Sequence, residues 1–146
     1  MSSLAPDGER YHPEQRGAVR SEHLHRYDAA FALVEARDVL DIACGEGYGS
    51  ALLARSARSV VGVDISPPAI AHAERTYARE NLRFALGSTA AIPLAVDAVD
   101  VVVSFETLEH VDDHAAMLAE IRRVLRPDGV LIVSTPDRPT YNASIV

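Results

Sequence analysis

The chain has 146 residues, of which 48% are hydrophobic, and this fits one domain with its own hydrophobic core. A formal charge of −7 argues against nonspecific attraction to nucleic acid or to an anionic membrane; with no stretch resembling a transmembrane helix or a signal peptide, we expect a cytoplasmic protein. One cysteine, Cys44, excludes an intrachain disulfide and a zinc site built from several cysteines, and the lack of lysine excludes Schiff-base and P-loop chemistry.

The first half of the chain predicts alternating helices and strands. A loose polar segment at residues 1–16 precedes a helix at 17–35, where apolar side chains recur at helical spacing. An apolar run predicts a buried strand at 38–43, and a short helix follows at 49–57. Another apolar run predicts the next strand at 59–64, so these segments form a β-α-β unit.

The second half continues this alternation. Prolines in the first turn predict the start of a helix at 67–79, because that turn leaves amide hydrogens unused. Strands are predicted at 81–86 and 98–104, then a helix at 112–125 and a last strand at 129–134.

Two of these helices have polar residues at their starts. Ser66 is the expected N-cap of the helix at 67–79, and either Asp112 or Asp113 is the expected N-cap of the helix at 112–125. The inward face of this last helix is expected to carry three apolar side chains, Leu118, Ile121 and Leu125.

Strands that are almost continuously apolar, alternating with helices, are typical of a parallel sheet covered on both faces. Right-handed crossovers then give an α/β fold: a Rossmann-like, doubly wound, mostly parallel sheet in a three-layer α/β/α sandwich. We expect this domain to span residues 17–136, between the flexible segment 1–16 and a tail at 137–146. Ligands of such sheets bind beyond the carboxyl ends of the strands.

The stretch VLDIACGEGYGS, residues 39–50, places three glycines in the turn after the first strand: Gly45, Gly47 and Gly49. Glycine permits positive φ angles and leaves no Cβ in the way of a ligand. A merely tight turn would need one glycine. The pattern therefore predicts a ligand that is held directly against the backbone.

An acidic residue ends the second strand. Asp64, in VVGVDIS, can accept hydrogen bonds from two ribose hydroxyls, which predicts an adenosine-containing ligand. The dinucleotide fingerprint G-x-G-x-x-G is not matched, because Ser50 occupies its third glycine position. Asp41 and Glu46 beside the loop favour a ligand with a positive centre, such as the sulfonium and ammonium groups of S-adenosylmethionine.

With these motifs in this order, residues 22–136 resemble the class I S-adenosylmethionine-dependent methyltransferases. VLDIACGEGYGS resembles the first motif of that family, and VVGVDIS resembles the motif after it. GSTAAIPLAVDAVDVVVSFETLEHV resembles the segment between the third and fourth strands, and EIRRVLRPDGVLIVSTP the segment that ends in the fifth. The start of the chain, GERYHPE…SEHLHRY, resembles a bacterial subgroup that often occurs beside glycosyltransferases.

The resemblance implies S-adenosylmethionine as cofactor and S-adenosylhomocysteine as product. It implies that Gly45 and Gly47 pack under the methionine part and that Asp41 orders the loop. It also implies that Asp64 binds the ribose hydroxyls and that Ile65 lies against the adenine. The other implied cofactor contacts are Tyr27, Ala43, Tyr48, Ser88, Thr89 and Phe105.

Methyl transfer from a sulfonium is an in-line displacement, so positioning supplies much of the catalysis. A general base is needed only when the acceptor is a hydroxyl or a protonated amine. The resemblance implies that Glu106 and His110, in FETLEHV, lie near the methyl group and the acceptor, with His110 as the candidate base. Packing or capping of the next helix is the alternative role of His110.

The same segment supports a second hypothesis. Glu106, Glu109 and His110 form E-x-x-E-H, which resembles the metal-binding segment of small-RNA 2′-O-methyltransferases and of some quinone O-methyltransferases. Two carboxylates and an imidazole could hold Mg²⁺ and activate a hydroxyl. Apart from His114, the further histidine expected from a later segment is absent, so no metal site is predicted and Mg²⁺ stays an alternative.

The leading hypothesis is a methyltransferase that acts on a small molecule, such as a sugar, a glycan precursor or a secondary metabolite. Class I enzymes usually continue beyond the fifth strand, whereas this chain ends soon after it, without the C-terminal strands. The last strand would then be an exposed edge, which a second copy could cover in a homodimer. The alternative functions are a catalytically silent cofactor-binding or scaffold module and an NAD-dependent oxidoreductase.

Overall fold

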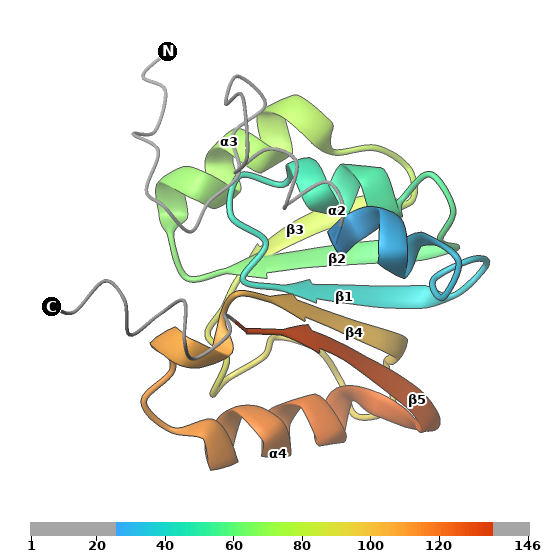
Figure 1. Ribbon diagram of the computed structural model, residues 1–146. Helices are drawn as coiled ribbons and strands as arrows, with labels where there is room; N and C mark the ends of the chain where they lie inside the picture. The colour runs from blue at the N-terminus through green and yellow to red at the C-terminus, as the bar shows by residue number, and fades with distance from the viewer. Residues whose placement is uncertain (1–25, 136–146) are drawn as a thin grey trace, which may run out of the picture.

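The computed structural model describes residues 26–135, which form one five-stranded sheet with helices on both faces (Figure 1). The strand order is β3-β2-β1-β4-β5, and every pairing is parallel. This confirms the predicted Rossmann-like α/β sandwich. The elements in chain order are β1 (Asp38–Ile42), α2 (Tyr48–Leu53), β2 (Ser59–Asp64), α3 (Pro67–Tyr77), β3 (Leu82–Leu86), β4 (Val99–Phe105), the 3-10 helix η1 (Leu108–His110), α4 (His114–Val124) and β5 (Leu125–Ser134).

The first predicted helix is shorter than expected at its end. Residues 26–31 are helical and turns follow them, so the prediction that this helix reaches residue 35 was wrong. The chain must reverse there to enter β1: Ala36 adopts a φ of 56° and its amide donates to the Ser56 carbonyl at 3.0 Å. The part of this helix before residue 26, the segment 1–16 and the tail 137–146 lie outside the described residues.

The sheet carries an apolar layer on each face. Residues 26–31, α2 and α3 cover one face, and α4 covers the other (Figure 1). On β4, Val101 and Val103 pack into the first layer while Val102 packs into the second, and all three are fully buried. Burial on both faces explains why this strand is a continuous apolar run in the sequence.

Helix α4 buries a different stripe from the predicted one. Met117, Ile121 and Val124 face the sheet, at the spacing of one helix face. Leu118 was predicted to face inward but is 50% exposed, because each residue turns the helix by about 100° and Met117 already occupies the buried side. Leu125, also predicted on this helix, is the first residue of β5 and packs against the same layer.

The predicted caps are present, although several element boundaries differ from the predicted ones. Ser66 accepts the Ala69 amide at the start of α3 (3.3 Å), and Asp113 accepts the Ala116 amide at the start of α4 (2.9 Å). Helix α2 ends four residues before the predicted residue 57. Strand β5 begins four residues before the predicted residue 129, and its pairing with β4 has a register shift.

This topology places the carboxyl ends of all strands at one edge of the sheet. The glycine turn follows β1 there, Asp64 ends β2 and Phe105 ends β4. The connection from β3 to β4, residues 87–98, contains no helix, unlike the connections from β1 to β2 and from β2 to β3. No helix within residues 26–135 is long and apolar enough to cross a membrane.

Charged side chains tie the strands together at the opposite, amino-terminal edge. The Asp38 carboxylate on β1 accepts Arg58 Nε (2.9 Å) and Arg58 Nη2 (2.6 Å), and it also accepts Arg126 Nη1 from β5 (3.0 Å). Arg126 Nη1 also pairs with Asp100 of β4 at 2.9 Å, and Asp100 accepts the Asp38 amide at 2.9 Å. The hydrogen bonds from Arg58 hold the pKa of Asp38 well below its ordinary range.

Replacing Asp38 with asparagine should therefore lower thermal stability at neutral pH. Because the folded-state pKa of Asp38 is depressed, the carboxylate stabilises the fold above its unfolded pKa and loses this effect as the pH falls. The main partner, Arg58, has 60% of its side chain exposed to solvent, which screens the pair, so we expect the unfolding midpoint to fall by only about 4 °C at pH 7. The midpoints of the two proteins should converge toward pH 2 in calorimetric scans, and an equal gap at both pH values would contradict this explanation.

Candidate functional site

The turn after β1 depends on unusual backbone angles. Gly45 adopts a φ of 59° and Gly47 a φ of 94°, and Ala43, which is not a glycine, adopts 62°. Left-handed angles favour glycine, so the first two glycines are explained by the path of the chain. Gly47 is also the N-cap residue of α2, and no side chain caps this helix.

Close packing adds a reason for Gly47 and Gly49. A Cβ on Gly47 would lie 2.8 Å from the Cβ of Ala73 and 2.8 Å from the ring of Phe84. A Cβ on Gly49 would overlap the ring of Tyr27, which comes from the first helix. The missing Cβ at these two positions therefore makes room for other side chains of the protein. The prediction that all three glycines clear space for a ligand was incomplete.

Asp41 is a buried carboxylate behind this turn, with 1% of its surface exposed. It accepts the hydroxyl of Ser50 at 2.7 Å and the hydroxyl of Tyr27 at 3.2 Å. Burial, together with the nearby charge of Asp64, raises the pKa of Asp41 to about 7, although the two hydrogen bonds act in the opposite direction. Burial and the Asp41 charge also raise the pKa of Tyr27. Asp41 thus links β1 to the first helix and to α2.

The elevated pKa of Asp41 predicts a specific pH dependence of stability. The folded state holds the proton more tightly than the unfolded state, so this group's stabilisation is lost as the pH rises from about 4 to about 7. Asparagine keeps an oxygen for both hydroxyl donors and does not titrate. We therefore expect the stability of Asp41→Asn to rise relative to that of the native chain as the pH increases from about 4 to about 7, by at most about 1.4 kcal/mol per pH unit. Urea unfolding at several pH values measures this difference; a constant difference would contradict it.

Asp64 fixes the geometry at the end of β2 and is 5% exposed. One carboxylate oxygen accepts the Gly45 amide at 2.9 Å, and the other accepts the Ser66 amide at 2.9 Å. The carboxylate therefore joins the glycine turn to the start of α3. An ionised carboxylate offers about four acceptor positions, so these two hydrogen bonds do not by themselves fill it.

A cavity of about 440 Å³ opens beside Asp64. Six of the predicted site residues line it together: Ala43, Asp64, Ile65, Ser88, Thr89 and His110. Ile65 is 72% exposed, so its apolar side chain is available to a ligand in this cavity. Sequence reasoning missed other lining residues, among them Thr107, Val111, Asp112 and Asp113, because the 3-10 turn that brings them here leaves no periodic pattern.

Other predicted site residues do not line this cavity. The rings of Tyr27 and Phe105 meet edge to face, with centroids 5.0 Å apart. Glu106 follows Phe105 with a φ of 53°, and its carboxylate pairs with Arg26 of the first helix. No pattern in the sequence predicted that Arg26 would pair with Glu106. Tyr48 meets Tyr77 of α3, with ring centroids 6.2 Å apart.

The predicted catalytic pair is not brought together in one pocket. His110 lines the cavity, whereas Glu106 is held by Arg26. His110 Nε2 lies 3.6 Å from Glu109 Oε1, and the other oxygen of Glu109 accepts the Thr135 hydroxyl at 3.3 Å. Within residues 26–135, no three His, Cys, Asp or Glu side chains form a group that could hold a metal ion.

Comparison with known proteins agrees with this geometry. The family described as a methyltransferase domain matches residues 40–133. A probable S-adenosylmethionine-dependent methyltransferase of Mycolicibacterium smegmatis is 47% identical over 106 residues, which cover 73% of this chain and 40% of the relative. A ubiquinone biosynthesis O-methyltransferase of Cereibacter sphaeroides is 37% identical over 102 residues, covering 68% of this chain and 41% of the relative.

A solved structure of another protein has a similar fold. The PH0226 protein from Pyrococcus horikoshii has a TM-score of 0.72 and 30% sequence identity, covering 85% of this chain and 63% of that one. The chain spans about two fifths of the length of the curated relatives described above. The family match covers most of the chain, including the glycine turn, Asp64 and His110. The chain therefore belongs to the class I S-adenosylmethionine-dependent methyltransferase family.

Proposed function

We propose that this chain binds S-adenosylmethionine and transfers its methyl group to a small-molecule acceptor. The observation that carries the proposal is the position of Asp64, which joins the glycine turn to α3 at the mouth of the 440 Å³ cavity. A carboxylate held in this way is oriented before a ligand arrives, so it can receive ribose hydroxyls with little further ordering.

The chemistry of the surrounding residues fits each part of this cofactor. Adenosine suits the largely apolar cavity, with Ile65 against the base and the hydroxyls of Ser88 and Thr89 near its polar edge. The methionine part carries an ammonium group, which suits the glycine turn in front of Asp41. Once a cation lies there, ionisation of Asp41 becomes favourable. Gly45, Gly47 and Tyr48 would then form the wall beneath the methionine part, and Tyr27 and Phe105 would close one side.

The transfer itself needs little chemistry from the protein. S-adenosylmethionine supplies an electrophilic methyl group: the acceptor atom bonds to this carbon while the carbon–sulfur bond breaks and its electron pair stays on sulfur. The residues of the chain hold the two reactants in line, which is the main source of catalysis. For a hydroxyl acceptor, His110 is the proposed base that removes the proton, since it lines the cavity and follows β4. Glu106 is placed to anchor the first helix through Arg26.

The proposed acceptors are sugars, glycan precursors or secondary metabolites in the cytoplasm. One relative is by name an O-methyltransferase of ubiquinone biosynthesis, which supports a small molecule with a hydroxyl group. The formal charge of −7 disfavours nucleic acid and an anionic membrane. Fractionation of cells that express the chain would test the location.

We also propose that a second copy of the chain covers the edge of β5 in a homodimer. Strand β5 is the last strand of the sheet, and Val130 and Val133 on it are 39% and 47% exposed. Exposed apolar edges invite further pairing. Sedimentation over a range of concentrations should show a dimer; a monomer throughout would exclude this pairing between copies.

Calorimetric titration tests the proposed function. S-adenosylmethionine and S-adenosylhomocysteine should both show saturable binding, and NAD should show none, with the same result in the presence and absence of Mg²⁺. Incubation with methyl-labelled cofactor and a panel of sugars, glycan precursors and phenols should then give labelled product. Saturable binding of NAD alone would overturn the cofactor assignment, and binding without transfer to any acceptor would support a silent module instead.

A further inference from the structure

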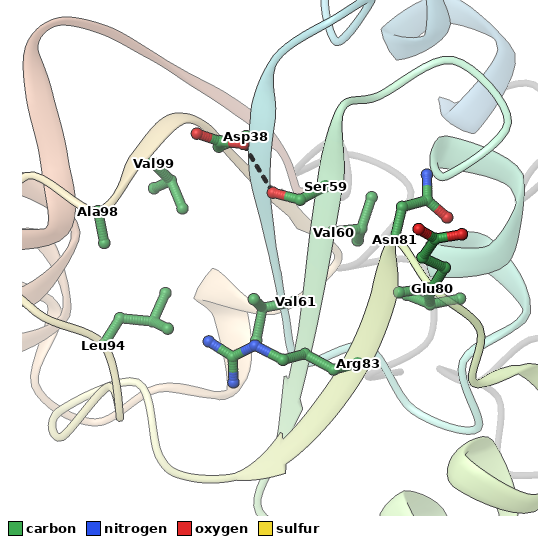
Figure 2. Close-up of a pocket in the computed structure, with 11 residues that line it drawn as sticks. Asp38, Ser59, Val60, Val61, Glu80, Asn81, Arg83, Leu94, Ala98 and Val99 are labelled. Atoms are coloured by element: carbon green, nitrogen blue, oxygen red, sulfur yellow. Dashed lines mark hydrogen bonds between the residues drawn. The ribbon is translucent and has the colours of Figure 1, made fainter.

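A second cavity, of about 300 Å³, lies at the amino-terminal edge of the sheet, at the opposite end of the strands from Asp64 and the glycine turn (Figure 2). It is bounded by the start of β2, by β3 and by the segment that enters β4. Its volume is at the lower end of the range for small-molecule sites. None of the residues that line it lines the 440 Å³ cavity.

One wall of this cavity is held firmly in place. The connection from β3 to β4 has no helix, and α4 fixes it instead through two charged side chains. Arg123 donates to the carbonyls of Leu94 (2.8 Å) and Ile92 (2.9 Å), while Glu120 accepts the Ile92 amide at 2.8 Å. Leu94 and, further along, Ala98 form the wall itself. The hollow is therefore a built feature of the fold.

The floor of the cavity is apolar. Val61 of β2 and Val99 of β4 are 7% and 3% exposed, and Leu94 packs against the same core layer. Leu94 and Ala98 are partly exposed, so a ligand that covers them would gain roughly 25 cal/mol for each Å² of apolar surface removed from water. The floor alone would accept any small hydrocarbon, so the polar groups must decide what binds.

Three charged side chains line the cavity, and they differ in their pairing: Asp38, Glu80 and Arg83. The Asp38 carboxylate is already engaged by Arg58, Arg126 and the Ser59 hydroxyl. Arg83 has no hydrogen bond or ion pair with any described residue. In Figure 2 its guanidinium points toward Leu94 and Val61, while Glu80 stands at the other end of the cavity. Arg83 is also the register partner of Val61, so both side chains leave the same face of the sheet.

We propose that this cavity binds a small organic monoanion, with a carboxylate paired to Arg83 and a short hydrocarbon body over Val61, Leu94 and Val99. A guanidinium matches the two oxygens of a carboxylate. The Glu80 carboxylate lies at the other end of the cavity from the Arg83 guanidinium, so it does not occupy this position. The hydrocarbon body would cover Leu94 and Ala98, which are partly exposed and which an inorganic anion would not cover. Because this site lies at the opposite edge of the sheet, it is separate from the proposed cofactor site.

Octanoate is a suitable probe, because it combines the two features that the cavity requires. Titration of the full chain by calorimetry should show one octanoate site with a dissociation constant of about 1 mM or tighter. Acetate, which has the charge without the chain, and octan-1-ol, which has the chain without the charge, should each bind at least roughly tenfold more weakly. Binding of S-adenosylmethionine should be unchanged by octanoate.

Variants locate the bound octanoate. Arg83→Gln should weaken it by about tenfold or more, since a charge-assisted pair is lost. Ala98→Leu should abolish it by filling the cavity, and an unfolding midpoint close to that of the native chain would show that this variant is folded. The matched control is Arg122→Gln, an exposed arginine on α4 without a described partner, which should bind octanoate normally. No saturable octanoate binding to the native chain, or binding that survives both test variants, would overturn the proposal.

Discussion

Replacing Asp64 with alanine is expected to weaken the binding of S-adenosylmethionine by at least about 100-fold. The substitution removes an acceptor for the ribose hydroxyls, and two hydrogen bonds to a charged group are together worth about 3 kcal/mol or more. It also leaves the Gly45 and Ser66 amides without the carboxylate that holds them at 2.9 Å. The cofactor would lose a contact and the turn would lose its fixed shape.

Two further variants separate these effects. Asp64→Asn keeps one amide acceptor but removes the charge, and we expect it to bind the cofactor more weakly than the native chain but more tightly than Asp64→Ala. Glu74→Ala, an exposed acid on α3, is the control and should leave the affinity unchanged. If Asp64→Ala folds and binds S-adenosylmethionine with native affinity, the ribose assignment is wrong.

The sequence predicted those parts of the fold that depend on local patterns. Apolar runs located the strands, and Ser66 was correctly predicted as the cap of α3 because a cap acts on an amide three residues away. The glycine turn and Asp64 were correctly expected at the carboxyl ends of their strands, and the structure joins them there by a hydrogen bond from the Gly45 amide to Asp64.

The remaining contacts join residues that are distant in the sequence. The pairing of Arg26 with Glu106 depends on where the first helix crosses β4, which no local period encodes. No local pattern encodes the second cavity either. Its wall depends on Arg123 of α4, which donates to two carbonyls in the loop between β3 and β4. Thr107 and Val111 line the first cavity because they flank the 3-10 turn η1. A turn of this length is too short to produce a periodic pattern that sequence analysis could detect.

Gly49 belongs to the cofactor motif, but packing against Tyr27 is a second reason for glycine at this position. Replacing Gly49 with alanine is therefore expected to have a large effect on stability. Alanine normally stabilises a helix by up to about 1 kcal/mol relative to glycine. Here the added Cβ would overlap the ring of Tyr27, so the ring must move. Tyr27 would then lose its hydrogen bond to Asp41 and its edge-to-face contact with Phe105. We expect Gly49→Ala to cost about 2–4 kcal/mol of unfolding free energy, from overpacking and the lost hydrogen bond.

A double-mutant cycle tests whether the ring is the cause. In a Tyr27→Ala background the space above Gly49 is empty, so Gly49→Ala should be neutral or slightly stabilising there, by the ordinary helix preference. The difference between its effects in the two backgrounds, measured by urea unfolding, should therefore exceed about 2 kcal/mol. If Gly49→Ala costs the same in both backgrounds, contact with Tyr27 does not explain the glycine. The third glycine of the motif would then have to be explained by the ligand, as the sequence pattern first indicated.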